Sequence, residues 1–113
     1  MDCLFCKIAN GDIKTNFIHS DEQIVAFNDI APQAPHHILI IPRKHIATIN
    51  EFTPNDTLLL GQLMQTAKKI AADLKIADDG YRLLMNCNKQ GGQAVYHIHF
   101  HLLGGRQMHW PPG

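Results

Sequence analysis

The chain has 113 residues, of which 45% are hydrophobic, and its 10 basic and 10 acidic side chains give a formal net charge of zero. This length suffices for one domain with a core and is too short for two. The charge balance excludes the one-signed field of a protein that binds a nucleic acid polymer or an anionic membrane. The sequence has neither a basic leader nor a membrane-length apolar run, and its 3 cysteines suit a reducing compartment, so we expect a cytoplasmic protein.

The first half of the chain predicts one short helix and three strands. Residues 3–9 are expected to be helical up to the Asn10-Gly11 stop signal. A strand is predicted over 24–28, with 17–19 as its hairpin partner. Two prolines make 29–35 a loop, and the continuous apolar run 37–41 predicts a central strand.

The second half predicts one long helix and a hairpin. The sequence Thr53-Pro54-Asn55-Asp56 supplies an N-cap, a proline at the first helical position and an acid at the third, and apolar residues then recur at helical spacing to about Lys75. Strands are predicted over 81–88 and 95–103, with a turn at 89–92. The whole pattern indicates an α+β fold.

Three histidines occupy alternate positions in the last predicted strand. His97, His99 and His101 would share one face of a sheet, because side chains on a strand repeat every two residues. Imidazoles so placed favour nucleophilic or acid-base chemistry on phosphate, or metal binding, over simple packing. The outer two would lie about 13 Å apart, so one ion cannot bind all three.

The N-terminal cysteines have the spacing of metal ligands. Cys3 and Cys6 are separated by two residues, and the chain has 8 histidines that could complete a set of four. The alternative is a pair of reduced cysteines on a helix.

Four motifs together resemble one known family. They are His97-Ile98-His99-Phe100-His101-Leu102-Leu103, Asp29-Ile30-Ala31-Pro32-Gln33-Ala34-Pro35 ahead of His37, Gly91-Gly92-Gln93, and the ending His109-Trp110-Pro111-Pro112-Gly113. On these residues the chain resembles the histidine triad (HIT) family, and within it the nucleotide-binding branch of purine nucleoside phosphoramidases.

The resemblance implies a fold and an assembly. The expected domain covers residues 1–113, with a five-stranded antiparallel sheet, one long helix and a short N-terminal helix. Two subunits would join their sheets into one of ten strands. The tail 104–113 would carry Trp110 to the partner subunit's active site, whereas the alternative is a tail packed on its own domain.

The resemblance also implies the reaction. His99 would attack the phosphorus of a purine nucleoside 5'-phosphoramidate, adenosine type preferred, and form a nucleotidyl-histidine that water hydrolyses to a nucleoside monophosphate. His101, when protonated, would stabilise negative charge or help protonate the leaving amine, and His37 would complete the catalytic group. A backbone carbonyl is expected to fix the tautomer of His99. No organic cofactor is expected.

The implied nucleotide site draws on several segments. Asp29 would bind the ribose, Phe27 and Ile30 would border the base, and Gln93 would add a phosphate donor. At Ala94 many relatives carry a serine, so one leaving-group contact is missing. The full implied set is Phe27, Asp29, Ile30, Asn86, Gly92, Gln93, Ala94, His99, His101 and Trp110.

Zinc-bearing relatives complete the cysteine pair with two histidines. The resemblance therefore implies a structural zinc site at Cys3, Cys6, His45 and His97, which leaves His99 and His101 for chemistry. Two other functions stay open: a dinucleoside polyphosphate hydrolase using the same covalent step, and a nucleotide- or zinc-binding interaction module with incidental activity. The Trp110 ending favours the phosphoramidase.

Overall fold

One antiparallel sheet, in the order β1-β2-β3-β5-β4, organises residues 2–113, which are the part of the chain that this computed structural model describes. The strands are β1 (His19–Ser20), β2 (Ile24–Asn28), β3 (His36–Pro42), β4 (Tyr81–Leu84) and β5 (Phe100–Gly104). The helices are α1 (Leu4–Asn10) and α2 (Thr57–Asp73), with 3-10 turns at Ile49–Glu51 and Pro54–Asp56. The expected architecture of five antiparallel strands, one long helix and one short helix is confirmed.

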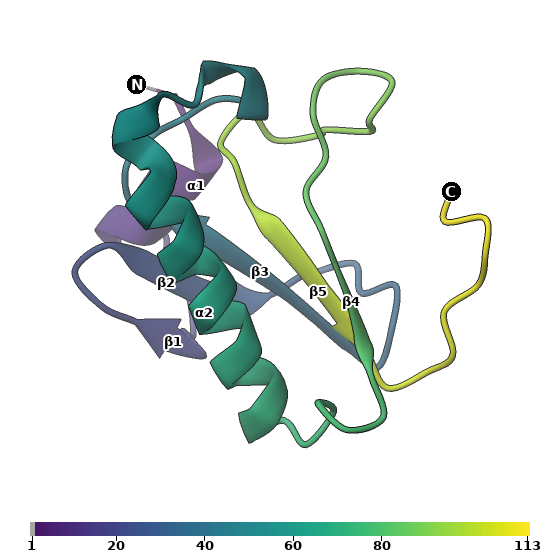
Figure 1. Ribbon diagram of the computed structural model, residues 1–113. Helices are drawn as coiled ribbons and strands as arrows, with labels where there is room; N and C mark the ends of the chain where they lie inside the picture. The colour runs from purple at the N-terminus through teal and green to yellow at the C-terminus, as the bar shows by residue number, and fades with distance from the viewer. Residues whose placement is uncertain (1) are drawn as a thin grey trace.

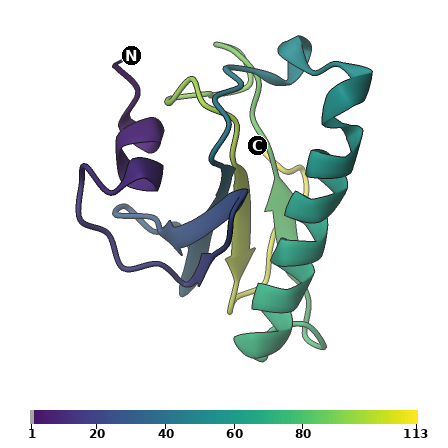
Figure 2. The same cartoon turned by 90° about the vertical axis from the view of Figure 1, so that its left-hand side faces the viewer.

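The two helices cover opposite faces of the sheet (Figures 1 and 2). Alternate strand residues, including Ala26 and Ile40, pack with Leu63 and Ala67 of α2 in the larger core. Their neighbours on the other face, including Val25, pack with Phe5 and Ile8 of α1 in the smaller core. Because both faces are covered, β2 and β3 are almost continuously apolar. Successive residues still alternate between the larger and the smaller core, as the two-residue period of a strand requires.

Capping groups set the helix boundaries. At α1, Cys3 occupies the N-cap and its Sγ accepts a hydrogen bond from the Cys6 backbone N–H (3.3 Å), while Gly11 ends the helix with φ 83°. The predicted capping box forms between Thr53 and Asp56, but the first turn after it is a 3-10 turn. The α-helix therefore begins at Thr57, later than the sequence predicts, and ends at Asp73.

The predicted hairpin strands are too long. β4 stops at Leu84 and β5 begins at Phe100, so residues 85–88 and 95–99 are not paired strand. The backbone turns away between them, with positive φ at Asn88 (60°) and Gly92 (79°). Consequently the prediction of three histidines on one regular strand is wrong, because His97 and His99 precede β5.

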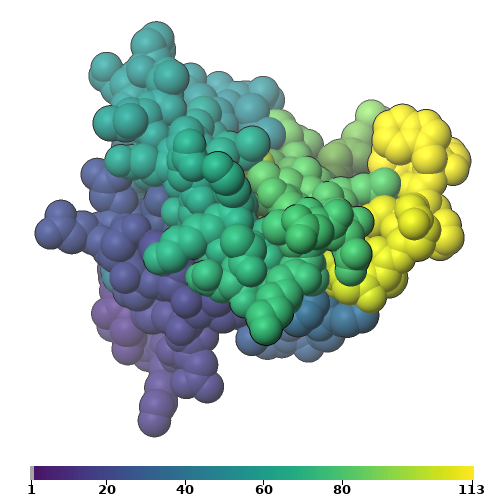
Figure 3. Space-filling model, turned by 60° about the horizontal axis from the view of Figure 1, so that its bottom comes forward, coloured from purple at the N-terminus to yellow at the C-terminus, as the bar shows by residue number. Residues whose placement is uncertain are grey.

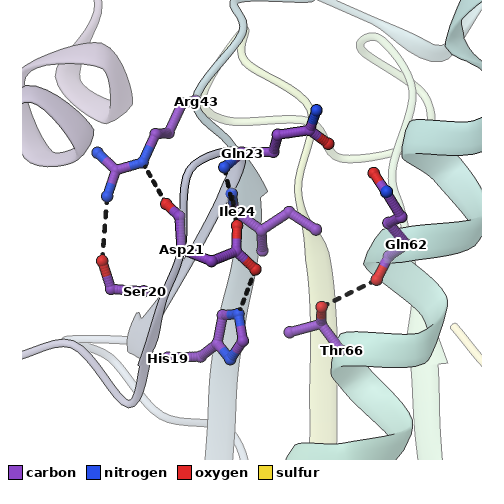
Figure 4. Close-up of polar contacts among 8 residues, drawn as sticks. All are labelled: His19, Ser20, Asp21, Gln23, Ile24, Arg43, Gln62 and Thr66. Carbon is purple, nitrogen blue, oxygen red and sulfur yellow. Dashed lines mark hydrogen bonds and ion pairs between the residues drawn. The ribbon is translucent and has the colours of Figure 1, made fainter.

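Arg43 ties the β1–β2 turn to the rest of the fold (Figure 4). Its Nε donates to the Asp21 carbonyl (2.8 Å) and its guanidinium also donates to the Ser20 hydroxyl (3.0 Å) and the Ala9 carbonyl of α1. The Asp21 carboxylate accepts from the backbone N–H of Ile24 (2.8 Å) and closes the turn. These contacts fix the C-terminal end of α1 against the sheet.

The C-terminal tail follows β5 in the chain and lies on the outside of the molecule, beyond β4 (Figures 1 and 3). The Arg82 guanidinium donates to the backbone carbonyl of His109 (2.9 Å), and the Trp110 side chain is 82% exposed. Among residues 2–113 no helix has the length and apolar character needed to span a membrane.

Candidate active site

A cavity of about 540 Å³ opens on the α1 side of the sheet. It lies beside the face that bears Leu39 of β3 and His101, its register partner on β5. The residues that line it are Leu4, Phe5, Ile8, Ile13, Lys14, Thr15, Phe27, Asn28, Asp29, Ile30, Leu39, Asn86, Gly92, Ala94, Val95, His99 and His101. Most of the residues implied for nucleotide binding are therefore brought together in one place.

The N-terminal segment contributes a wall that the sequence did not reveal. Leu4, Phe5 and Ile8 of α1, followed by residues 13–15, line the cavity opposite the strands. The signal was present as apolar residues at i and i+4 on a short helix, but it is also the pattern of an ordinary packed helix. The Phe5 ring packs edge-on against Phe27, with centroids 5.6 Å apart, and so joins the wall to β2.

The His99 imidazole is held in one orientation. Its Nδ1–H donates to the backbone carbonyl of His97 (2.7 Å), as expected, because a carbonyl can only accept. The Phe5 ring also packs edge-on against it at 5.0 Å. Burial lowers the pKa of His99, opposed by that hydrogen bond and by the Asp29 carboxylate. The ring is therefore neutral near pH 7, and its Nε2 carries a free lone pair.

Two consecutive hydrogen bonds fix the positions of the ring protons of His37 and His101. The backbone N–H of Gln33 donates to Nδ1 of the buried His37 (3.0 Å), so the proton of the neutral His37 ring is on Nε2. That Nε2–H donates to Nδ1 of His101 (2.8 Å). The remaining proton of neutral His101 is consequently on Nε2, where it is available to a ligand in the cavity.

This arrangement keeps His101 neutral near pH 7. Burial lowers the pKa of His101 to about 4, with further contributions from the neighbouring His99 and His37 rings. Burial also lowers the pKa of His37, against the raising effect of Asp29. The sequence led us to expect that His101 acts in its protonated form. With a pKa of about 4 the ring is instead neutral near pH 7 and offers one N–H donor.

Asp29 is anchored beside the histidine pair. One carboxylate oxygen accepts from the Ala31 backbone N–H (2.8 Å) and the other lies 3.5 Å from Nε2 of His37. Ligand atoms of Asp29, His37 and His101 lie within 4.8 Å of one another, as in some metal sites. A metal on Nε2 of His37 would, however, require the proton on Nδ1, where it would face the Gln33 N–H donor. The tautomers thus favour a proton-bearing pair over a metal site.

A second cluster of four residues adjoins the cavity behind His99. The ligand atoms of Cys3, Cys6, His45 and His97 all lie within 4.8 Å of one another. Nδ1 of His97 is 3.4 Å from Cys3 Sγ, 3.5 Å from Cys6 Sγ and 3.2 Å from Nδ1 of His45. Cys6 Sγ is 3.4 Å from Nδ1 of His45. Four converging soft and imidazole ligands make a group that could hold one metal ion.

His97 connects this cluster to the cavity. Its Nε2–H donates to the Pro42 carbonyl (2.7 Å), which leaves the Nδ1 lone pair directed into the cluster. Its own backbone carbonyl is the acceptor that orients His99. The three histidines of the motif therefore differ: His97 belongs to the cysteine cluster, and His99 and His101 line the cavity.

The Gln93 side chain supports the loop and lies outside the cavity lining. Its amide nitrogen donates to the carbonyls of Ala47 (2.7 Å) and Val95 (3.1 Å), and its oxygen accepts from the Asn88 backbone N–H (2.8 Å). With both ends of the amide engaged, we do not assign Gln93 to the phosphate. Trp110 also lies outside the cavity of its own chain.

Residues 10–108 match the HIT domain family. The chain is also 49% identical over 107 residues to the purine nucleoside phosphoramidase of Escherichia coli (strain K12), a match that covers 95% of this chain and 90% of that protein. The chain belongs to the HIT family. The matched residues include the histidine motif at 97–103 and the loop at 29–35.

Solved HIT structures share the whole fold. A HIT family hydrolase from Legionella pneumophila Philadelphia 1 superposes with a TM-score of 0.98 at 57% identity, covering 99% of this chain and 100% of the other. A histidine triad protein from Clostridium difficile gives a TM-score of 0.92 at 38% identity, covering 96% and 94%. Agreement over both chain lengths places α1 and the loop before β5 within the shared HIT architecture.

Proposed function

We propose that the protein hydrolyses purine nucleoside 5'-phosphoramidates to a nucleoside monophosphate and an amine. The observation that carries the proposal is the fixed tautomer of His99, whose Nδ1–H is bound to a carbonyl while the ring lines the cavity. A neutral imidazole with one free lone pair is a nucleophile for phosphorus. The similarity to a purine nucleoside phosphoramidase supports the same substrate class.

The proposed reaction has two steps. Nε2 of His99 bonds to phosphorus as the bond from phosphorus to the amine nitrogen breaks, and water then displaces His99 from phosphorus. In the first step the amine leaves with a proton taken from solvent, and in the second step water gives its hydroxide to phosphorus and returns a proton to solvent, so that one water molecule is consumed overall. The Nε2–H of His101 donates to a phosphoryl oxygen as charge develops, and the hydrogen bond from His37 Nε2–H to His101 Nδ1 keeps the His101 proton on Nε2.

Nucleoside binding follows from the cavity walls. Asp29, anchored by Ala31, would accept hydrogen bonds from the two ribose hydroxyls. Phe27 and Ile30 would border the base, together with Phe5 and Ile8 from α1. The amine would leave on the side of Asn86, Gly92 and Ala94, where alanine offers no hydroxyl. The preference for adenosine is a prediction from the family resemblance.

The function is tested with His99→Ala. We expect this variant to lose turnover of an adenosine phosphoramidate by at least about a thousandfold while AMP still binds, because ring removal leaves the ribose and base walls intact. The matched control is His19→Ala, which should leave turnover unchanged, because His19 lies on β1 and its ring bonds to the Asp21 carboxylate outside the cavity lining. Turnover of a dinucleoside polyphosphate with no turnover of the phosphoramidate would favour the alternative hydrolase and contradict the proposal.

We further propose that the cysteine cluster holds a structural zinc ion. Tetrahedral zinc with bonds of about 2.05 Å to nitrogen and 2.3 Å to sulfur separates its nitrogen and sulfur ligands by about 3.5 Å and two nitrogens by about 3.3 Å. The cluster distances of 3.4, 3.4 and 3.5 Å between nitrogen and sulfur and 3.2 Å between nitrogens fit this geometry. With Cys3, Cys6, His45 and His97 as four ligands, the ion would have no open position for substrate.

A homodimer is also proposed. β4 is an edge strand of the sheet, and pairing it with the same strand of a second copy would make the expected ten-stranded sheet. The exposed Trp110 on the tail 104–113 would then be free to reach the partner's cavity. The cytoplasmic location stays a prediction from the sequence.

A further inference from the structure

Lys14 is a cation in the lining of the cavity, in the segment 13–15 that follows α1. The apolar residues Ile8, Ile13, Phe27 and Ile30 line the same cavity. Within residues 2–113 the Lys14 ammonium forms no ion pair and no hydrogen bond, unlike Lys44, which pairs with Asp56. Its donors are therefore available to a ligand in the cavity.

The backbone that carries Lys14 is held in place against α1. The Lys7 carbonyl accepts from the backbone N–H groups of both Asp12 (2.9 Å) and Ile13 (3.2 Å). The Thr15 hydroxyl donates to the Ile13 carbonyl (3.3 Å). The long lysine stem can lie along the apolar wall while its ammonium stays at the water boundary, which places the charge at the rim of the cavity.

The proposed nucleotide orientation brings the base edge to this rim. With phosphorus at His99 and ribose at Asp29, the base extends toward the apolar residues beyond Phe27. This step rests on the proposed function. A purine stacked there would bury its faces against apolar side chains and can turn the edge that bears N7 and the substituent at position 6 toward Lys14.

We propose that Lys14 selects for purines with an oxygen at position 6. An ammonium group has three donors and no acceptor. Hypoxanthine and guanine present two acceptors, N7 and O6, whereas adenine presents N7 beside an N6 amino group that is itself a donor. Lys14 can therefore donate to both acceptors of hypoxanthine or guanine, whereas on adenine it can donate to N7 but faces a second donor at the N6 amino group. This moves base preference away from adenine, opposite to the expectation from family resemblance.

The solvent exposure of Lys14 limits how strongly it can change the base preference. Because Lys14 is solvent-exposed, its contact with the base is screened, and about a threefold change in the substrate ratio is expected. The effect falls on KM and not on kcat, because the contact is made equally in the ground state and the transition state.

The test compares inosine and adenosine 5'-phosphoramidates of the same amine, which differ at position 6 and N1 and share ribose, phosphate and leaving group. We would measure kcat and KM for Lys14→Met, which keeps the apolar stem and removes the charge, and for Lys14→Arg, which keeps donors. Lys69→Met on α2 removes a charge away from the cavity and is the control. Equilibrium binding of IMP and AMP gives the same comparison without turnover.

In Lys14→Met, the inosine-to-adenosine ratio of kcat/KM should fall about threefold through KM. Lys14→Arg should restore most of the ratio, and Lys69→Met should match the unmodified protein. An unchanged ratio, or an equal loss for both nucleosides, would overturn the role of Lys14. If neither phosphoramidate is hydrolysed, the proposed function fails, and the IMP-to-AMP binding ratio still decides the Lys14 proposal.

Discussion

At the scale of single residues, the site depends on where protons are held. Two consecutive hydrogen bonds, from the Gln33 backbone N–H to His37 and from His37 to His101, leave one N–H of His101 for the ligand. His99 is fixed separately by the His97 carbonyl. Protein hydrogen bonds thus prepare a neutral nucleophile and a neutral donor without using any net charge, which agrees with a chain whose formal charge is zero.

The low pKa of His101 predicts a pH dependence of stability. Its pKa is about 4 in the folded protein and about 6.5 when unfolded, so between these values the unfolded chain binds the additional proton. The free energy of unfolding should therefore decrease as pH falls from 6.5 to 4. His101→Asn should flatten this slope by up to about 1.4 kcal/mol per pH unit, the value for one proton.

Urea denaturation at several pH values measures this slope, and NMR titration of the His101 ring measures its pKa directly. The other buried histidines are present in both proteins, so the difference between the two curves reports on His101 together with its interactions with His37 and His99. Parallel curves together with a ring pKa near 6.5 would contradict the hydrogen-bonded neutral pair.

At the scale of elements, the sequence predicted what depends on local patterns. β2 was placed at Ile24–Asn28 because its apolar run and flanking turn are local, and the caps at Thr53 and Gly11 were recognisable for the same reason. The segment between β4 and β5 differs from the prediction, because residues 85–88 and 95–99 are not paired strand. There Gln93 bonds to Ala47, a contact between residues far apart in the chain that no local pattern reveals.

The same limit applies to the site. The alternating motif predicted that the His97, His99 and His101 side chains share one face of a strand. Alternation alone could not show that the strand begins only at Phe100. The cluster with Cys3 and Cys6 forms because the backbone before Phe100 turns His97 toward α1. The sequence did not mark Lys14 as a binding residue, because an exposed lysine shortly after a helix is common in any protein.

Zinc binding by α1 predicts a defined metal content. Protein purified without added metal should contain about one zinc ion per chain, because four ligands already converge. Replacing Cys3 and Cys6 by serine should abolish the metal and lower the melting temperature, since α1 would lose its attachment to His45 and His97. Cys87→Ser, outside the cluster, is the matched control. Metal analysis that finds no zinc in the intact protein would refute the site.

At the scale of the whole molecule, the unpaired edge of β4 and the tail predict assembly. Sedimentation or light scattering should give the mass of two chains, about 25 kDa for a chain of 12.7 kDa. Removal of the residues after Met108 deletes Trp110 and should lower activity while the dimer persists, because β4 remains. A fully active monomer would refute both the dimer and the role of the tail.

The central claim is that His99 forms a covalent bond to phosphorus. Mass spectrometry of a rapidly quenched reaction with an adenosine phosphoramidate tests it most directly. We predict a peptide spanning residues 97–101 that carries one adenylyl group on His99, and no such adduct in His99→Ala. Turnover without any adduct, or an adduct on His37 or His101, would contradict the proposed mechanism.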